Sequence, residues 1–236
     1  VTITAQAGTL QPFTALYDVD YGKFTVGRAE FSLTAFPQDC YRYQGNLKPT
    51  GLASMFKGDR VNESSEFCII NGTHIKPQKY VFDHAGNPKK AAKENVTLSF
   101  NWKTHKVTDD KGGVRDLPAD ALDRLVIQMA MRKRLIDLRG KSLPTAPFVL
   151  TMIEKDRIVS YTLQIIGIET VQTPMGKLQA VRLDRIDNPA KVTRFWAGIA
   201  QDYLPVKVEQ QKNDDTPIRL NIVSVTLGAS PTSPAK

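Results

Sequence analysis

Apolar and polar residues alternate with a period of two along most of the chain. The alternating segments are rich in Val, Ile, Thr, Phe and Tyr, which favour half-buried strands. The predicted strands cover residues 17–21, 24–33, 40–44, 66–70, 78–83 and 95–102, and then residues 148–154, 157–170, 178–184, 192–196, 206–211 and 218–227. Turn residues separate them, such as Gly22 in the first hairpin and the Pro174 to Gly176 turn in the second group. We therefore expect a sheet-dominated protein.

One segment, residues 118–135, has the period of a helix instead. Leu122, Leu125, Val126 and Met129 fall at the i, i+3, i+4 and i+7 positions of one helical face. Such a stripe predicts a helix that covers the apolar face of the sheet.

The charges at the two ends of this segment suit a helix dipole. Asp120 and Asp123 lie near the expected positive end, and Arg132, Lys133 and Arg134 lie near the expected negative end. The three successive basic residues are also a candidate contact for an anionic partner. An ordinary solvated basic face is the alternative interpretation.

These elements predict a mainly β protein with one principal helix (α+β). Long strands twist, so we expect a curved antiparallel sheet or a half-open β-barrel that wraps the helix. The length of 236 residues suits one β-rich domain at residues 12–227, preceded by a flexible N-terminus at residues 1–11. Residues 228–236 are small, polar and Pro-rich, which predicts a disordered tail. Residues 50–60 are ambiguous between a loop and a short helix.

Composition and charge narrow the class of protein. The hydrophobic fraction of 41% and the charged fraction of 24% are typical of a folded domain. The sequence has no run of the roughly 20 apolar residues that a transmembrane helix needs. The formal charge of +8 favours contact with a polyanion. No nucleic-acid partner is predicted, because no helix-turn-helix, zinc-finger or aromatic-basic signature is found.

Two cysteines, Cys40 and Cys68, predict one disulfide if the protein is exported. Two buried free thiols and a single nucleophilic thiol are the alternatives. Residues 5–7, Ala-Gln-Ala, have the small-x-small form of a signal-peptidase site, although an arbitrary start of the sequence explains them equally well.

The sequence contains no motif that predicts catalysis. His74, His84 and His105 are scattered and share no metal-ligand spacing with the cysteines. The Gly-x-Ser-x-Gly elbow of hydrolases and the phosphate-binding loop are both missing from the sequence. We therefore predict no catalytic residue, no metal site and no cofactor, and expect a protein that is not an enzyme.

Two further side chains have candidate roles in the interior. Trp196, like Met129 in the predicted helix, is a candidate anchor of either the core or a cavity. Glu169 lies in an Ile-rich strand, so its burial would require a partner such as an Arg from a neighbouring strand.

Three elements carry a family resemblance. They are Tyr17-x-Val19-x-Tyr21-Gly22 with Gly27, the turn at residues 167–176, and Phe195-Trp196 followed by Leu204-Pro205-Val206-Lys207. Together they resemble the bacterial domain of unknown function 3108 family over about residues 17–227. The resemblance implies an export signal and the periplasm of a Gram-negative bacterium, and it supplies no catalytic residues. The pattern is also similar in kind to envelope carriers that shuttle lipoproteins, an analogy of fold alone.

The sequence thus predicts an exported protein that binds or carries a lipid-like or anionic component of the cell envelope. The alternative is a structural protein that docks on another envelope protein through the basic helix end or a strand edge. The sequence does not determine the ligand or the oligomeric state.

Overall fold

The computed structural model describes residues 10–50, 60–85 and 88–228. The predicted signal-peptidase remnant at residues 5–7 lies outside the described residues, as do nearly all of the predicted C-terminal tail and of the ambiguous segment 50–60. Leu10, which we placed in the flexible N-terminus, is only 1% exposed. The packed part of the chain therefore begins before residue 12.

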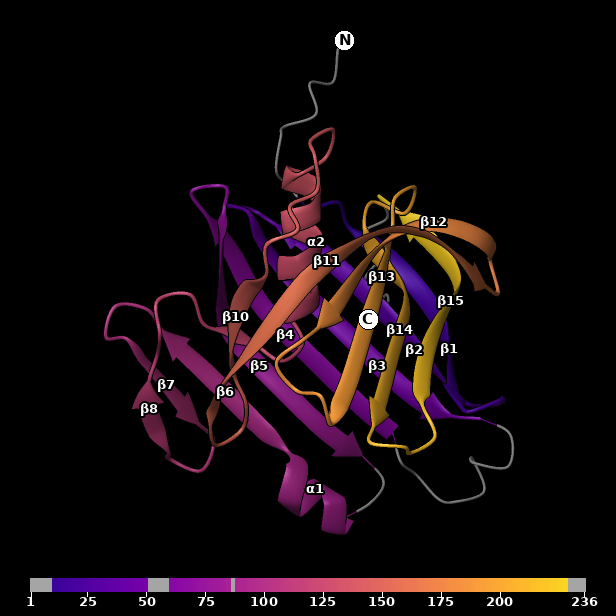
Figure 1. Ribbon diagram of the computed structural model, residues 1–236. Helices are drawn as coiled ribbons and strands as arrows, with labels where there is room; N and C mark the ends of the chain where they lie inside the picture. Colours follow the sequence, from indigo (N-terminus) through magenta and orange to yellow (C-terminus); the bar gives the residue numbers. More distant parts are fainter. Residues whose placement is uncertain (1–9, 51–59, 86–87, 229–236) are drawn as a thin grey trace.

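Strands make up most of the described chain (Figure 1). The first half contains β1 (Phe13–Tyr21), β2 (Phe24–Phe36), β3 (Cys40–Pro49), β4 (Arg60–Ile70), β5 (His74–Ala85), β6 (Val96–Asn101), β7 (Lys106–Asp109) and β8 (Val114–Asp116). The second half contains β9 (Leu122–Asp123), β10 (Phe148–Ile153), β11 (Ile158–Thr173), β12 (Gly176–Arg185), β13 (Lys191–Gly198), β14 (Leu204–Lys212) and β15 (Ile218–Leu227). Most of the predicted strands are therefore confirmed, while β7, β8 and β9 were not predicted.

All these strands form one 15-stranded sheet in two meanders. One meander runs from β1 outward to β8, the other runs from β15 outward to β9, and β1 pairs with β15 to join them. Neighbours are antiparallel except for the short parallel pair of β9 and β10. The sheet does not close within the described residues, because β8 and β9 are its two edges.

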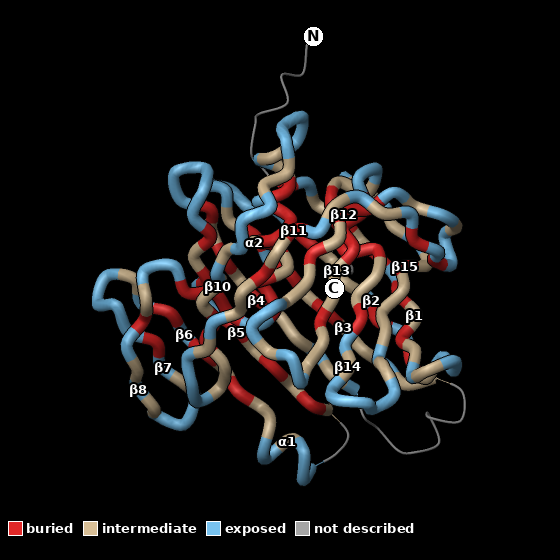
Figure 2. The backbone as a smooth tube through the Cα atoms, in the orientation of Figure 1, coloured by how far each residue is buried: buried red, intermediate tan, exposed pale blue. Residues whose placement is uncertain are grey.

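The alternation of the sequence becomes an alternation of burial. In β1, Phe13, Ala15, Tyr17 and Val19 are buried and the residues between them are more exposed. Figure 2 shows such alternating buried and exposed positions along the strands. Burial of one side of each strand provides the main stabilisation of the fold, about 25 cal/mol for each Å² of apolar surface removed from water.

The predicted β1–β2 hairpin is confirmed, with Gly22 and Lys23 in its turn. Gly22 has a φ of +63°, which favours glycine, and a Cβ atom there would approach the Thr216 side chain to 2.9 Å. The predicted Pro174 turn is also present, between β11 and β12.

The described residues contain two helices, α1 (Pro88–Glu94) and α2 (Ile127–Asp137), where the sequence predicted one principal helix. α1 was missed because it is a single short stretch without a buried residue, so it has no apolar stripe. α2 begins nine residues later than the predicted helix.

The late start of α2 has a local physical cause. Asp123 accepts hydrogen bonds from the backbone N–H groups of Leu125 (2.9 Å) and Val126 (2.8 Å). A short polar side chain that binds nearby backbone groups in this way competes with helix formation. Residues 118–126 therefore form turns and β9, and neither Asp120 nor Asp123 lies in a helical first turn as predicted. The apolar stripe still marks core residues, since Leu122, Leu125 and Val126 are buried.

α2 packs against strands from both halves of the sheet (Figure 1). Gln128 accepts a hydrogen bond from the hydroxyl of Tyr43 in β3 (2.8 Å). The guanidinium of Arg132 lies over the ring of Phe13 in β1, and that of Arg134 over the ring of Phe148 in β10. The helix thereby fills part of the space between the two halves.

Candidate functional site

The interior between the two halves of the sheet contains clefts beside the first turn of α2. Two adjacent clefts, of about 340 Å³ and about 160 Å³, are both lined by Gln128, Phe195 and Gln210. We call these two clefts together the interior cleft. The shared residues place the two clefts side by side next to α2, β13 and β14, and we refer to them as the larger and the smaller branch of the interior cleft.

The smaller branch of the interior cleft is mostly apolar. Its lining comprises Tyr17, Phe31, Gln128, Phe195, Pro205, Val208, Gln210, Ile218 and Leu220. The hydroxyl of Tyr17 donates a hydrogen bond to the carbonyl of Pro205 at 2.8 Å. Burial raises the pKa of Tyr17, so the hydroxyl stays neutral. Because the only polar atom of this side chain has a partner, the ring presents an apolar surface to the cleft.

The larger branch has charged groups in its lining. Arg124, Arg185 and Lys191 provide three positive charges against the two carboxylates of Glu63 and Glu154. The Arg124 side chain is 52% exposed and pairs with Glu63 at 3.2 Å, so this branch reaches the surface.

Arg185 is held more firmly than Arg124. Its guanidinium carbon lies 3.6 Å from the ring centre of Tyr161, and its nitrogen lies 2.6 Å from a carboxylate oxygen of Asp187. The hydrogen bond from Arg185 keeps the pKa of Asp187 below its usual value. A cation fixed between an aromatic ring and a carboxylate is ordered in advance for contact with a ligand.

A buried acid, Asp123, lies shortly before α2 and next in sequence to Arg124, which lines the larger branch. Asp123 is fully buried, and its second carboxyl oxygen lies 2.5 Å from the hydroxyl of Ser65 in β4. Burial raises the pKa of Asp123 to about 7, while the donors around it oppose that rise. This role could not be predicted from the sequence, because Ser65 is 58 positions away and no local signal marks the pair.

The three basic residues predicted as an anionic contact do not form a common exposed surface. Arg132 is 1% exposed and points inward. It donates hydrogen bonds to the carboxylate of Asp202 (2.5 Å), the carbonyl of Asp202 (3.0 Å) and the carbonyl of Gln11 (3.0 Å). Burial lowers the pKa of Arg132, and Asp202 opposes that effect. Arg132 therefore joins α2 to Asp202 and Gln11, and the prediction that it contacts an anionic partner was wrong.

Lys133 and Arg134 differ in burial and in their contacts. Lys133 is 3% exposed, and its ammonium lies 2.7 Å from each carboxylate oxygen of Asp137. Arg134 alone is exposed, with its guanidinium 4.1 Å from the ring centre of Phe148. Successive helical residues are about 100° apart around the axis, so three in a row cannot share one face.

Met129 and Trp196 are anchors of the core. Met129 is fully buried in the main core cluster, and Trp196 is 6% exposed in the same cluster. Neither residue lines the interior cleft. The indole N–H of Trp196 donates to Glu169 at 2.9 Å, and Arg182 of the neighbouring strand donates to the same carboxylate at 3.0 Å. The Arg partner predicted for Glu169 is therefore present, and these hydrogen bonds lower the pKa of Glu169.

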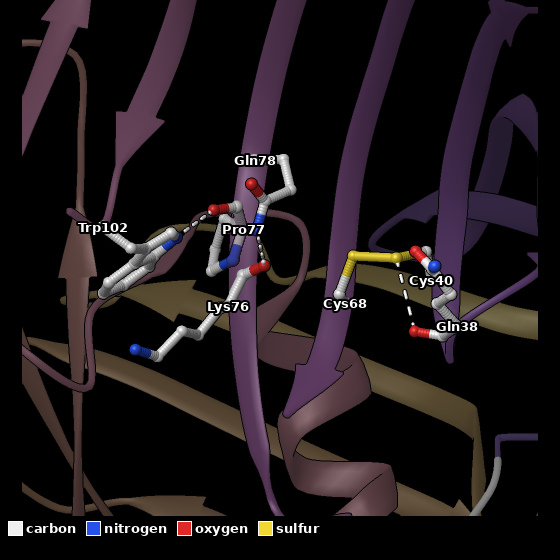
Figure 3. The surroundings of a disulfide bond; sticks show 7 residues. All are labelled: Gln38, Cys40, Cys68, Lys76, Pro77, Gln78 and Trp102. Atoms are coloured by element: carbon white, nitrogen blue, oxygen red, sulfur yellow. Dashed lines mark hydrogen bonds between the residues drawn. A yellow bond between two sulfur atoms is a disulfide. The ribbon is translucent and has the colours of Figure 1, made fainter. Parts of the chain in front are cut away.

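The predicted disulfide between Cys40 and Cys68 is formed, and it joins directly opposed residues of β3 and β4 (Figure 3). Neither cysteine is then available as a nucleophile. Among the described residues, no group of three His, Cys, Asp or Glu side chains can hold a metal ion. In the same part of the chain, no helix has the length and apolarity needed to span a membrane.

The profile of the family described as "Protein of unknown function (DUF3108)" matches residues 16–222. The chain belongs to this family. No curated protein sequence matches this DUF3108 chain significantly.

Solved structures resemble this DUF3108 chain in fold. One is the β-barrel-like protein of domain of unknown function DUF1849 from Brucella abortus, with a TM-score of 0.60 and 14% identity, covering 94% of this chain and 99% of that one. Another, described as a candidate lipoprotein of Parabacteroides distasonis, has a TM-score of 0.41 and 9% identity, covering 92% of this chain and 96% of that one. The first likeness supports a β-barrel-like architecture for DUF3108.

Two of the three motifs that carry the family resemblance contribute to the interior cleft of this DUF3108 protein, and the turn at residues 167–176 does not. Tyr17, Phe195 and Pro205 belong to those motifs and also line the cleft. They come from β1, β13 and β14: β13 and β14 are consecutive strands that pair with each other, whereas β1 is far from both in the sequence and is joined to β14 through β15. The cleft itself could therefore not be assembled from the sequence.

Proposed function

We propose that this protein binds an elongated apolar ligand with an anionic end in the interior cleft, as an exported carrier of a lipid-like cell-envelope component. The observation that carries this proposal is the union of two branches, one apolar and one rimmed by Arg124, Arg185 and Lys191. A mostly apolar cleft with a few fixed polar groups is the usual form of a small-molecule site. The proposed activity is binding without catalysis.

The ligand's chemistry follows from this lining. The rings and aliphatic side chains around Leu220 favour a hydrocarbon chain, since each buried methylene contributes about 0.8 kcal/mol. The excess of one positive charge in the larger branch favours an anionic end over a cationic one. The disulfide supports export, because such bonds persist in oxidising compartments.

The proposed docking role through the basic helix end has no comparable support. It required Arg132, Lys133 and Arg134 to act together on the surface, and two of the three are buried. A strand-edge contact, for which β8 and β9 provide the edges, is left as an outcome of the experiment.

The proposal is tested by titrating the full chain with palmitate, hexadecanol and hexadecyltrimethylammonium below their aggregation concentrations, followed by calorimetry and native mass spectrometry. We expect saturable binding of one palmitate, weaker binding of the neutral alcohol and the weakest binding of the cation. Equal binding of all three, or no binding by any, would contradict the proposal. The second result would favour the docking role.

Two matched pairs of variants locate the bound ligand. Leu220→Trp fills the apolar branch, whereas Ser224→Trp places the same ring at an exposed position of the same strand. Lys191→Glu reverses a charge in the larger branch, whereas Lys177→Glu reverses an exposed charge outside it. We expect palmitate binding to weaken about tenfold or more in the first member of each pair and to be unchanged in the second. Unchanged binding by Leu220→Trp would place the ligand elsewhere.

A further inference from the structure

A second cleft lies beside β9, one of the two edge strands of the sheet. Its volume is about 440 Å³, and it lies between β5, the β9 and β10 edge and the C-terminal half of α2. We call it the seam cleft. Its lining shares no residue with the interior cleft.

The seam cleft has an apolar wall contributed by distant parts of the chain. Ile75 comes from β5, Leu122 from β9, Leu150 from β10 and Ala130 from α2. A cleft of this volume is within the range of about 300–1,000 Å³ that is usual for small-molecule sites. It is therefore larger than a bare inorganic anion requires.

The opposite wall of the seam cleft carries an excess of hydrogen-bond donors. Lys133, Arg134 and Lys141 contribute three positive charges, against the two carboxylates of Asp120 and Asp137. His74 adds a further donor. The wall therefore has net positive charge before any contribution from His74.

One of these cations is unusual in being buried. The side chain of Lys133 is 4% exposed, and its ammonium contacts both oxygens of Asp137. An ammonium has three N–H donors, so one donor of Lys133 remains when the other two bind the carboxylate oxygens of Asp137. Lys141 also donates to Asp137, through the backbone carbonyl at 2.8 Å. Asp137 is thus already engaged by two lysines, which lowers its capacity to attract a cationic ligand.

We propose that the seam cleft is a second binding site, which takes a small organic monoanion: a carboxylate with a medium-length apolar chain. The carboxylate contacts the ammonium of Lys133, the guanidinium of Arg134 and the ammonium of Lys141. The chain lies against Ile75, Leu122 and Leu150. Hydrogen bonds between ionised groups of this kind are the strong ones in proteins. The site goes beyond the proposed carrier function and does not depend on it.

The experiment uses the full chain and four probes: octanoate, octanol, octylammonium and inorganic phosphate, each titrated by calorimetry. We expect saturable binding of octanoate, with each of the other probes at least about tenfold weaker. Octylammonium binding as tight as octanoate binding would overturn the assignment, because the sign of the charge would then not matter. Phosphate binding as tight as octanoate binding would also overturn it, because the apolar wall would then contribute nothing.

Variants separate the seam cleft from other basic surfaces and from the interior cleft. The double variant Arg134→Gln/Lys141→Gln should weaken octanoate binding about tenfold or more, the effect of losing charge-assisted hydrogen bonds. Both side chains are exposed, so the fold should be retained. Lys111→Gln/Lys212→Gln, a matched change at exposed lysines elsewhere, should leave binding unchanged.

Two further variants test location. Ala130→Leu occupies the seam cleft without introducing a poor helix former and should also weaken octanoate binding. Leu220→Trp in the interior cleft should not affect it, which distinguishes a failure of this site from a failure of the carrier proposal. Octanoate binding that is lost in Leu220→Trp and kept in Ala130→Leu would overturn the seam-cleft assignment.

Discussion

α2 is held by two buried ionisable side chains, an acid just before its start and an arginine at its middle. At its start, Asp123 is surrounded by neutral donors, namely the hydroxyl of Ser65 and two backbone N–H groups. At its middle, Arg132 pairs with the carboxylate of Asp202. A carboxyl group can become neutral within the ordinary pH range, whereas a guanidinium stays charged. The start of the helix, which borders the interior cleft, is therefore sensitive to pH, and the Arg132 contact is not.

The Arg132 contact also holds a strained turn. Asp202 and Tyr203 have φ values of +52° and +57°, which are uncommon for residues with a side chain. Arg132 contacts both the backbone and the carboxylate of Asp202, and Arg139 contacts the same carboxylate. The turn between β13 and β14 is thus fastened to α2, which keeps this end of the interior packed.

The largest expected loss of stability comes from removing the contact between Arg132 and Asp202. Arg132→Met removes the buried guanidinium that contacts both the carboxylate and the backbone of Asp202, so that only the exposed Arg139 still pairs with this carboxylate. Breaking a buried ion pair typically lowers the free energy of unfolding by about 4 kcal/mol. Denaturant unfolding followed by circular dichroism measures the loss. Arg134→Met is the control on the same helix. The exposed guanidinium of Arg134 lies over the ring of Phe148, a contact that should contribute no more than about 1 kcal/mol to the free energy of unfolding. Equal losses would mean that Arg132 does not pin the helix.

Removing the disulfide tests whether β3 and β4 support the start of α2. It joins β3 and β4, and these strands carry Tyr43 and Ser65, the partners of Gln128 and Asp123. The double variant Cys40→Ser/Cys68→Ser should lower the free energy of unfolding by about 3.5 kcal/mol, because the unfolded chain gains entropy. A reductant should reproduce the loss in the original protein and have no effect on the variant. A reductant effect of equal size on both proteins would show that the loss has another origin.

A pair of truncations compares the packed and hollow parts of the interior directly. Met129→Ala removes a fully buried side chain and should cost about 3 kcal/mol, whereas Val208→Ala removes part of a side chain that already borders the interior cleft and should cost about 1 kcal/mol. Thermal and denaturant unfolding of both variants provide the comparison. If the two losses were equal, the interior near Val208 would be as well packed as that around α2.

The smallest effect is the pH dependence due to Asp123. Its pKa is about 7 in the folded protein and ordinarily about 4. Between about pH 4 and pH 7 the folded state therefore keeps a proton on Asp123 that the unfolded state has released. The free energy of unfolding consequently falls as the pH rises. From pH 5 to pH 7 the loss should be on the order of 2 kcal/mol. Glu209 and Asp187, whose pKa values are lowered, act in the opposite direction and only under more acidic conditions.

Asp123→Asn isolates this contribution. The amide keeps the oxygen that accepts from Leu125 and Val126 and offers an N–H to the hydroxyl of Ser65. We expect the variant to fold and to lose the decline in stability between pH 5 and pH 7, as measured by denaturant unfolding at each pH. An unchanged decline in the variant would assign the pH dependence to groups other than Asp123.

Local patterns in the sequence determined most of the sheet. Alternation along each strand depends only on which face that strand buries, so β1, β2 and β10 to β15 were predicted within a few residues. Gly22 and Pro174 marked their turns for the same reason, because a backbone preference is a property of the residue itself. The presence of only two cysteines left a single disulfide pairing to predict.

Only the tertiary structure decided where α2 begins, which way Arg132 points and where the clefts lie. Each of these depends on burial of a charged group or on the meeting of distant strands: Asp123 with Ser65, Arg132 with Asp202, and Tyr17 with Phe195 across the β1–β15 junction. The free energy of a buried charge is set by partners that are remote in sequence. Periodicity is local, and it therefore identified Leu122, Leu125 and Val126 as core residues while assigning them to the wrong element.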